Sequence, residues 1–221
     1  MLGIPKSWIL LAVLLSIYGC FKIVYPSGTW RYKLTLVVET PEGKIIGSAV
    51  RKVSAVSDPE WFPESVHGHA GVKGEAVVVD LGKRGVLFAL LKGNDDNDYG
   101  YNIIFNEFKH SGGTTPEGIK FYSNLKASKE LAFDKLPMLV RFRDINDPKT
   151  VEKVDPNNLA ASFGEGVKLV SAKLEMTDEG VTKGVERWIS KISWKEHGFA
   201  EWRSNLRYDQ VIFDWEDFER K

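Results

Sequence analysis

The chain of 221 residues has one cysteine, Cys20, which lies inside an apolar run near the N-terminus. The rest of the chain cannot form an internal disulfide, so its stability has to come from a packed core. Lys and Arg together number 30, as do Asp and Glu, so the formal net charge is zero. A general nucleic-acid binder needs an excess of positive charge, and we therefore expect no nucleic-acid partner.

Sequence motifs of common catalytic sites are also missing. Gly47-Ser48-Ala49 lacks the second glycine of a nucleophile elbow, and Gly112-Gly113-Thr114-Thr115 lacks the lysine of a phosphate-binding loop. Carboxylates are plentiful, but no spacing selects two of them for acid–base chemistry. Those considered are Glu64, Glu75, Asp80 and Asp144. We expect no cofactor, and the sequence favours a protein without enzymatic activity over an enzyme.

An uncharged apolar run extends from Trp8 to Phe21, between Lys6 and Lys22. A membrane span wants about 20 apolar residues, and counting on to Tyr25 lengthens the run towards that value. Lys22 lies near the end, where its ammonium can reach the interface while its stem stays in the hydrocarbon. We predict a signal anchor and short linker over residues 1–28, with the membrane as its partner. The expected location is the bacterial inner membrane, crossed once, with the C-terminal part in the periplasm.

Three alternatives to the uncleaved anchor stay open. Ile17-Tyr18-Gly19-Cys20 resembles a bacterial lipobox, which makes Cys20 a candidate for lipidation, although Tyr18 stands where a small residue is usual. An ordinary cleaved signal peptide would need an A-x-A-like site, and none follows the run. The run could also be a buried core helix.

The first half of the remaining chain has the patterns of strands. Apolar and polar residues alternate from Trp30 to Glu39, which predicts a strand with one buried face. Thr40-Pro41-Glu42-Gly43 has turn chemistry, so residues 44–56 should return as the second strand of a hairpin. We also expect a strand over residues 99–108.

Two further segments, 75–81 and 86–91, are apolar almost throughout, which is typical of strands covered on both faces. Gly82-Lys83-Arg84-Gly85 between them predicts a hairpin turn. Residues 138–143 should be another strand.

Helices are expected in the second half. Apolar spacing predicts one helix over 121–133, and another over 181–192 with Asp178 as its cap. Asp155 and Pro156 should open a short helix that ends at Gly164. Alternation then predicts a strand over 170–176.

These patterns together predict one fold class. It is α+β, a mainly antiparallel β-sheet with two or three packed helices, preceded by the N-terminal hydrophobic helix. No change of composition marks a second domain, so residues 29–221 should form a single β-rich domain.

Several stretches carry a resemblance to known proteins. They are LVVETPEGKIIGSAV, VKGEAVVVDLG, PMLVRF and VDPNNLAASFGEGVKL, together with the apolar N-terminal run. This combination resembles a family of uncharacterised bacterial proteins with an N-terminal membrane anchor. The resemblance implies a bacterial envelope setting, and it implies no activity, cofactor or site residue.

Candidate metal ligands are His67 and His69, which would point to the same side of a strand. His110 or His197 could supply a third ligand, and two solvated histidines in a Gly-rich loop are the simpler interpretation. Asp95, Asp96 and Asp98 invite a calcium interpretation, but the position that needs glycine in a calcium loop holds Tyr101. A polar loop is the better interpretation there.

Four tryptophans in the C-terminal third could form a binding surface or belong to the core. They are Trp188, Trp194, Trp202 and Trp215. The sequence as a whole favours a non-enzymatic envelope protein whose domain binds or scaffolds an envelope partner. The alternative is a periplasmic hydrolase with an unfamiliar site that uses His67, His69 or a carboxylate.

Overall fold

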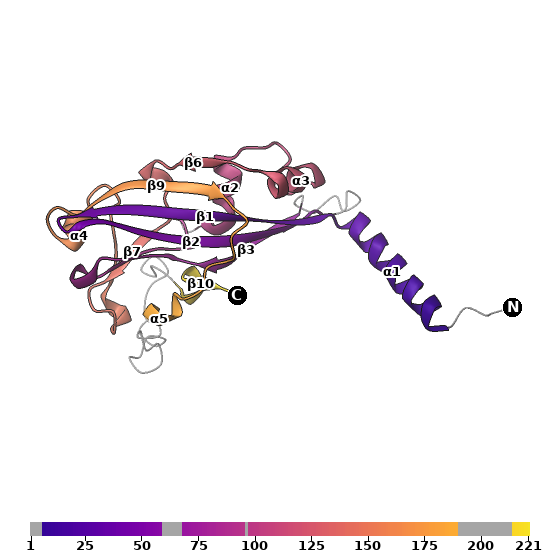
Figure 1. Ribbon diagram of the computed structural model, residues 1–221, viewed down its shortest axis with the longest axis horizontal. Coiled ribbons are helices and arrows are strands. Elements are labelled where there is room, and N and C mark those ends of the chain that lie inside the picture. Colours follow the sequence, from indigo (N-terminus) through magenta and orange to yellow (C-terminus); the bar gives the residue numbers. More distant parts are fainter. Residues whose placement is uncertain (1–5, 59–67, 96, 190–213) are drawn as a thin grey trace.

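The computed structural model describes residues 6–58, 68–95, 97–189 and 214–221, without the side chains of residues 6 and 17–24. Within these residues the chain is α+β and mostly strand, with two antiparallel sheets and five α-helices (Figure 1). The predicted α+β class with mainly antiparallel strands is confirmed. Four short helices contribute buried residues to the cores, where two or three were predicted.

The larger sheet has six strands in the order β10-β3-β2-β1-β9-β6. Its strands are β1 (Ser27–Thr40), β2 (Gly43–Val56), β3 (His69–Glu75), β6 (Ser128–Glu130), β9 (Lys168–Met176) and β10 (Glu219–Arg220). The smaller sheet has four strands in the order β4-β5-β7-β8. They are β4 (Val77–Asp80), β5 (Val86–Ala89), β7 (Leu139–Phe142) and β8 (Val151–Lys153).

The β1–β2 hairpin forms where its turn chemistry predicted it. The two strands pair over their whole length, and the turn closes at Thr40 and Gly43, whose φ of 132° suits glycine. Every second residue of β1 from Trp30 to Val38 is buried, as the alternation predicted. The β4–β5 hairpin is confirmed too, with a 3₁₀ turn at Gly82–Arg84.

Two hydrophobic cores lie on opposite sides of the four-stranded sheet. The first contains the alternating residues of β1 and β2, one face of β4 and β5, and residues of α2 (Tyr99–Glu107), α3 (Pro116–Asn124) and α4 (Leu159–Phe163). The second packs Phe88 and Phe142 against Phe218 and Ile189, the last residue of α5 (Glu186–Ile189). Phe218, which precedes the C-terminal strand, and α5 therefore cover the far side of the smaller sheet.

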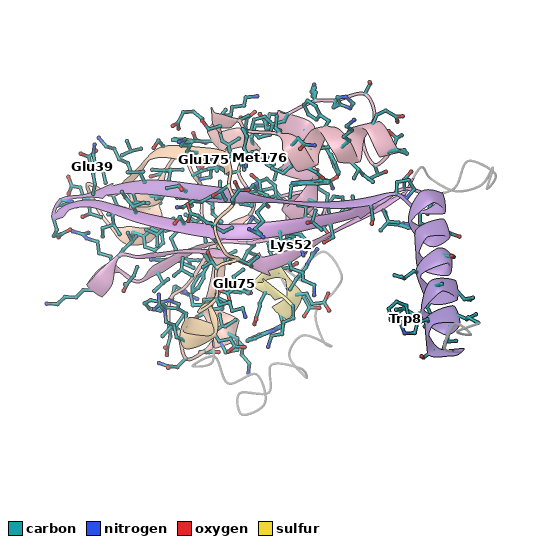
Figure 2. The ribbon with its side chains drawn as sticks, turned by 45° about the vertical axis from the view of Figure 1, so that its right-hand side comes forward. Trp8, Glu39, Lys52, Glu75, Glu175 and Met176 are labelled. Atoms are coloured by element: carbon teal, nitrogen blue, oxygen red, sulfur yellow. The ribbon has the colours of Figure 1, made fainter. Side chains whose placement is uncertain are left out.

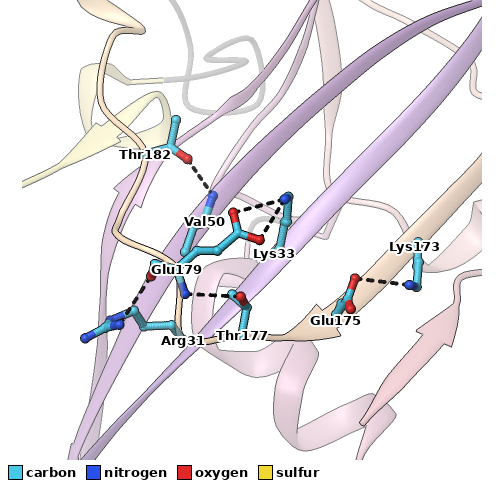
Figure 3. A network of polar contacts seen from close by, with 8 residues as sticks. All are labelled: Arg31, Lys33, Val50, Lys173, Glu175, Thr177, Glu179 and Thr182. Atoms are coloured by element: carbon cyan, nitrogen blue, oxygen red, sulfur yellow. Dashed lines mark hydrogen bonds and ion pairs between the residues drawn. The ribbon is translucent and has the colours of Figure 1, made fainter. Parts of the chain in front are cut away.

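The segment after β9 crosses the outer face of the large sheet (Figure 3). Arg31 Nη1 donates to the Asp178 carbonyl at 2.7 Å, and Lys33 Nζ pairs with Glu179 at 2.9 Å. Val50, which lies outside the β2–β3 pairing, then donates its N–H to Thr182 Oγ1 at 2.8 Å. The path ends at buried Glu75, whose carboxylate accepts the N–H groups of Gly184 and Val185 at 2.9 Å.

Residues 99–108, predicted as a strand, form helix α2 over Tyr99–Glu107 instead. The carboxylate of Asp98 accepts the N–H of Gly100 and caps the helix. Tyr99, Ile103 and Ile104 fall on one helical face and are buried in the core. The prediction was wrong because this segment is too short for period two and helical spacing to be separated.

The helix predicted over 121–133 lies earlier, as α3 over Pro116–Asn124. Thr115 caps it and Pro116 takes the first helical turn, so these local signals outweigh the later apolar spacing. Residues 128–130 pair with β9 as strand β6.

Three boundaries also differ from the predictions. The cap of α4 is Asn158 rather than Asp155, whose carboxylate accepts the N–H of Asn157 in the preceding turn. Asp178 is not a helix cap, because it pairs with Lys126 and α5 begins at Glu186. Residues 190–192 of the predicted helix lie outside the described residues.

Strand β9 is confirmed, but Val170 is exposed rather than buried. The β1–β9 register shifts between Val37, opposite Ser171, and Val38, opposite Leu169. Val170 is the extra residue of this bulge, and Leu169 is buried in its place.

The N-terminal residues form helix α1 (Lys6–Val24), which lies apart from the sheets in both views (Figures 1 and 2). The side chains of residues 7–16 are exposed, with Trp8 at 69% and Leu11 at 55%. Among the residues that the structure describes, no helix is both long enough and apolar enough to span a membrane.

Candidate functional site

A polar groove runs between α2 and the segment that contains β6 and the 3₁₀ turn Phe133–Lys135. Its volume is about 730 Å³. One wall is the α2 face that carries Tyr99, Asn102, Ile103 and Asn106, and the loop before α2 extends it. The other wall comes from Lys129 and from residues 134–136.

The position of α2 is fixed by close packing at its first turn. A Cβ atom on Gly100 would lie 2.5 Å from Cγ1 of Val72, so the helix start fits closely against β3 only because residue 100 is glycine. Asp98, which caps α2, also pairs with Arg220 of β10. The C-terminal strand therefore holds one end of the groove wall.

Tyr99 belongs to the α2 wall of the groove. Its ring is buried and its hydroxyl donates to the Lys135 carbonyl at 2.9 Å, which ties the two walls together. Burial raises the pKa of Tyr99 well above the ordinary value of 10.0. Glu107 and Lys129 form an ion pair at 2.6 Å that joins the same two walls elsewhere.

The groove is lined by amides and by charges of both signs. Its amide side chains are Asn94, Asn97, Asn102 and Asn106. Its charged side chains are Asp95, Glu107, Asp134, Lys109, Lys129 and Lys135. Among the described lining residues the three carboxylates are matched in number by three ammonium groups, and the side chains offer both donors and acceptors of hydrogen bonds.

Of the candidate metal ligands, His67 and His197 lie outside the described residues. His69 opens β3, with its side chain 82% exposed and its Nε2 3.6 Å from Asp58 Oδ2. The His110 ring stacks on Phe121, with the ring centroids 4.4 Å apart. The described part of the chain contains no group of three or more His, Cys, Asp or Glu residues that could hold a metal ion.

The described aspartates of the 95–98 loop have partners within the protein. Asp95 Oδ2 accepts from the Asn97 amide at 2.6 Å, and Asp98 caps α2. Asp96 lies outside the described residues. A helix does follow this loop, contrary to our expectation, but both described carboxylates have protein partners.

The carboxylates considered for acid–base chemistry have structural contacts instead. Glu75 accepts two backbone N–H groups, while Asp80 and Asp144 accept N–H groups of Gly82 and Asn146 within turns. Glu64 lies outside the described residues. Neither His69 nor any of the three described carboxylates lines the groove.

Two of the C-terminal tryptophans belong to the second core. Trp188 and Trp215 are half-buried and pack against it, whereas Trp194 and Trp202 lie outside the described residues. Cys20 lies on α1, and its side chain is also outside the description, so its lipidation stays a prediction.

Sequence reasoning missed the groove because it depends on the tertiary packing of α2. One signal was available in the sequence. Asn102 and Asn106 are four residues apart, which places both on one face of a helix.

Comparison with known proteins finds no matching family model, no similar curated protein and no similar solved structure.

Proposed function

We propose that this chain is a membrane-anchored bacterial envelope protein whose β-rich domain binds or scaffolds a partner and catalyses no reaction. The observation that carries the proposal is the exposed apolar surface of α1. Seven large hydrophobic side chains between positions 8 and 15 are each about half exposed or more. An apolar surface of this kind marks a segment that inserts into a membrane or docks on another molecule.

The shape of α1 favours insertion. Between positions 8 and 15 its apolar side chains lie on every side of the helix, whereas an interfacial helix keeps one charged face in water. In the sequence, Lys6 and Lys22 stand at the two ends, where lysine side chains can reach the headgroups.

The short connection between α1 and the domain supports anchoring as well. Only Tyr25 and Pro26 separate the helix from β1. The Pro26 carbonyl accepts the N–H of Ser57 at 2.8 Å, so the connection is tied to the end of β2. Insertion of α1 would therefore hold this end of the large sheet close to the bilayer.

Flotation with liposomes tests the proposal. The full chain should float with the vesicles and stay bound through an alkaline wash. The double variant Leu11→Lys, Leu14→Lys should stay at the bottom of the gradient, because each lysine at mid-membrane depth costs about 2.5–3.5 kcal/mol. Ile46→Lys is the matched control, since Ile46 is 67% exposed on the domain and should leave flotation unchanged. Equal flotation of the double variant would refute insertion.

The mass of the protein isolated from bacterial membranes separates the two kinds of anchor. A full-length mass supports the uncleaved helix at the inner membrane. A mass that corresponds to a chain beginning at an acylated Cys20 would instead support a lipoprotein. Protease added to spheroplasts should digest the domain if it lies in the periplasm, and protection would reverse the proposed orientation.

A further inference from the structure

We propose that the α2 groove binds a neutral oligosaccharide that carries acetamido groups. This inference rests on the proposed binding function of the domain and names the ligand class. The groove is the candidate site because it is hollow and polar, and because its described lining comes from two separate parts of the chain, residues 93–95 with 97–109 and residues 129–136.

The charges of the groove favour a neutral ligand. Among the described lining residues the numbers of carboxylates and ammonium groups are equal, so these residues give neither an anion nor a cation an excess of opposite charge. The N-terminus of α2 would attract a phosphate, but the Asp98 carboxylate already accepts the Gly100 N–H there. A phosphorylated ligand would also have to approach Asp95 and Asp134, which line the same groove.

The amides supply the recognition. Among the described residues, nothing hydrogen-bonds the side-chain amides of Asn94, Asn102 or Asn106, although Asn97 donates to Asp95. Asn102 and Asn106 are one helical turn apart, with Cβ atoms about 6 Å from each other on the groove face. Each amide offers one acceptor and two donor hydrogens. This pattern matches sugar hydroxyls and the N–H and C=O of an acetamido group.

The apolar part of the groove disfavours a peptide. Peptide grooves bind side chains in apolar pockets or add a strand to an open edge. Here Ile103 and Leu136 are each 3% exposed, and the Tyr99 ring is buried with its hydroxyl already bonded. These three side chains would thus offer a peptide little apolar surface. A sugar would bind through hydrogen bonds without a stacking aromatic platform, so we expect a weak, saturable interaction.

The test is a titration of the full chain in detergent micelles with tri-N-acetylchitotriose, followed by calorimetry. We expect saturable binding, at least about tenfold tighter than that of cellotriose, which lacks the acetamido groups. Inorganic phosphate and Ca²⁺ should not compete. The double variant Asn102→Ala, Asn106→Ala should bind at least about tenfold more weakly, because two hydrogen-bonding side chains are lost.

Two controls distinguish a loss of binding in the groove from unfolding and from the loss of an amide elsewhere. Alanine favours the helix, so the double variant should keep the unfolding midpoint of the wild type, and a loss of binding cannot be assigned to unfolding. Asn124→Ala, an exposed amide on α3, should leave the affinity unchanged. Absence of saturable binding, equal affinity for cellotriose, or full binding by the double variant would each overturn the inference.

The wild type and the variants used in calorimetry are also tested by flotation with liposomes. A chain that floats but binds no chitotriose overturns the ligand class and leaves the anchor standing. A chain that binds chitotriose but does not float overturns the anchor and leaves the groove standing.

Discussion

Arg51 lies opposite Tyr32 in the β1–β2 ladder, and its guanidinium carbon is 6.0 Å from the centroid of the Tyr32 ring. Both side chains are completely buried. The guanidinium donates to the carbonyls of Glu75, Ala89 and Leu90 at 3.0, 3.1 and 3.2 Å. Tyr32 in turn donates to the Gly100 carbonyl at 2.5 Å. One buried pair therefore joins the large sheet, the small sheet and the start of α2.

Arg51→Met should destabilise the domain strongly. The apolar side chain keeps much of the volume but leaves three buried carbonyls without their donor, which costs roughly 3 kcal/mol or more in total. Urea unfolding measures this as a lower midpoint at an unchanged slope. Lys52→Met is the control, because Lys52 is the next residue of β2, faces the other side of the sheet and is half-buried. Equal losses for the two variants would contradict this role of Arg51.

Tyr99 should make the domain sensitive to alkali. Burial raises the pKa of Tyr99 above its ordinary value of 10.0, so the folded state holds the phenol proton more tightly than the unfolded chain does. This stability is complete below pH 10 and is lost as the pH rises through the folded pKa. Burial raises the pKa of Tyr32 as well, and Tyr32 acts in the same direction.

Tyr99→Phe isolates this contribution. The variant has no proton to release, so its free energy of unfolding should fall less steeply above pH 10 than that of the wild type. At neutral pH it should lose about 1 kcal/mol, because the bond to the Lys135 carbonyl is gone. Tyr101→Phe, on the other side of α2, serves as the control. An unchanged alkaline slope for Tyr99→Phe would show that the assignment is wrong.

Gly47 is required where β2 passes over β4. A Cβ atom at this position would lie 2.3 Å from the Val78 carbonyl oxygen, so Gly47→Ala must push the two strands apart. We expect a loss of roughly 1–3 kcal/mol in thermal or urea unfolding. At Gly71 of β3 nothing lies within 4 Å of the added atom, so Gly71→Ala should be nearly neutral. A tolerated alanine at position 47 would mean that the two strands are not held this closely.

The sequence predicted those parts of the fold whose signals are local. The alternation of β1, the turn at Thr40–Gly43 and the two apolar strands around Gly82–Arg84 depend on neighbouring residues, and all three are found. The α3 start was equally local, since Thr115 and Pro116 are cap and first-turn residues, but we gave more weight to the later apolar spacing.

The rest depends on contacts between distant residues. The Val170 bulge follows from the pairing of β9 with β1, and the buried state of Arg51 follows from carbonyls 24 to 39 residues away. The groove forms only because α2 packs beside residues 134–136, which no periodicity reveals. For the same reason the sequence suggested His67 and His69 as candidate ligands and did not suggest Asn102 and Asn106.

Spin labels can test the anchor most directly. In a Cys20→Ser background, single nitroxides at Leu14→Cys and Ile46→Cys are placed on α1 and on the domain, at side chains that are 55% and 67% exposed. In liposomes we predict that the Leu14 label collides mainly with oxygen, which concentrates in the hydrocarbon. The Ile46 label should collide mainly with a water-soluble nickel chelate. If the Leu14 label also collided mainly with nickel, α1 would lie in water and the proposed membrane anchor would be wrong.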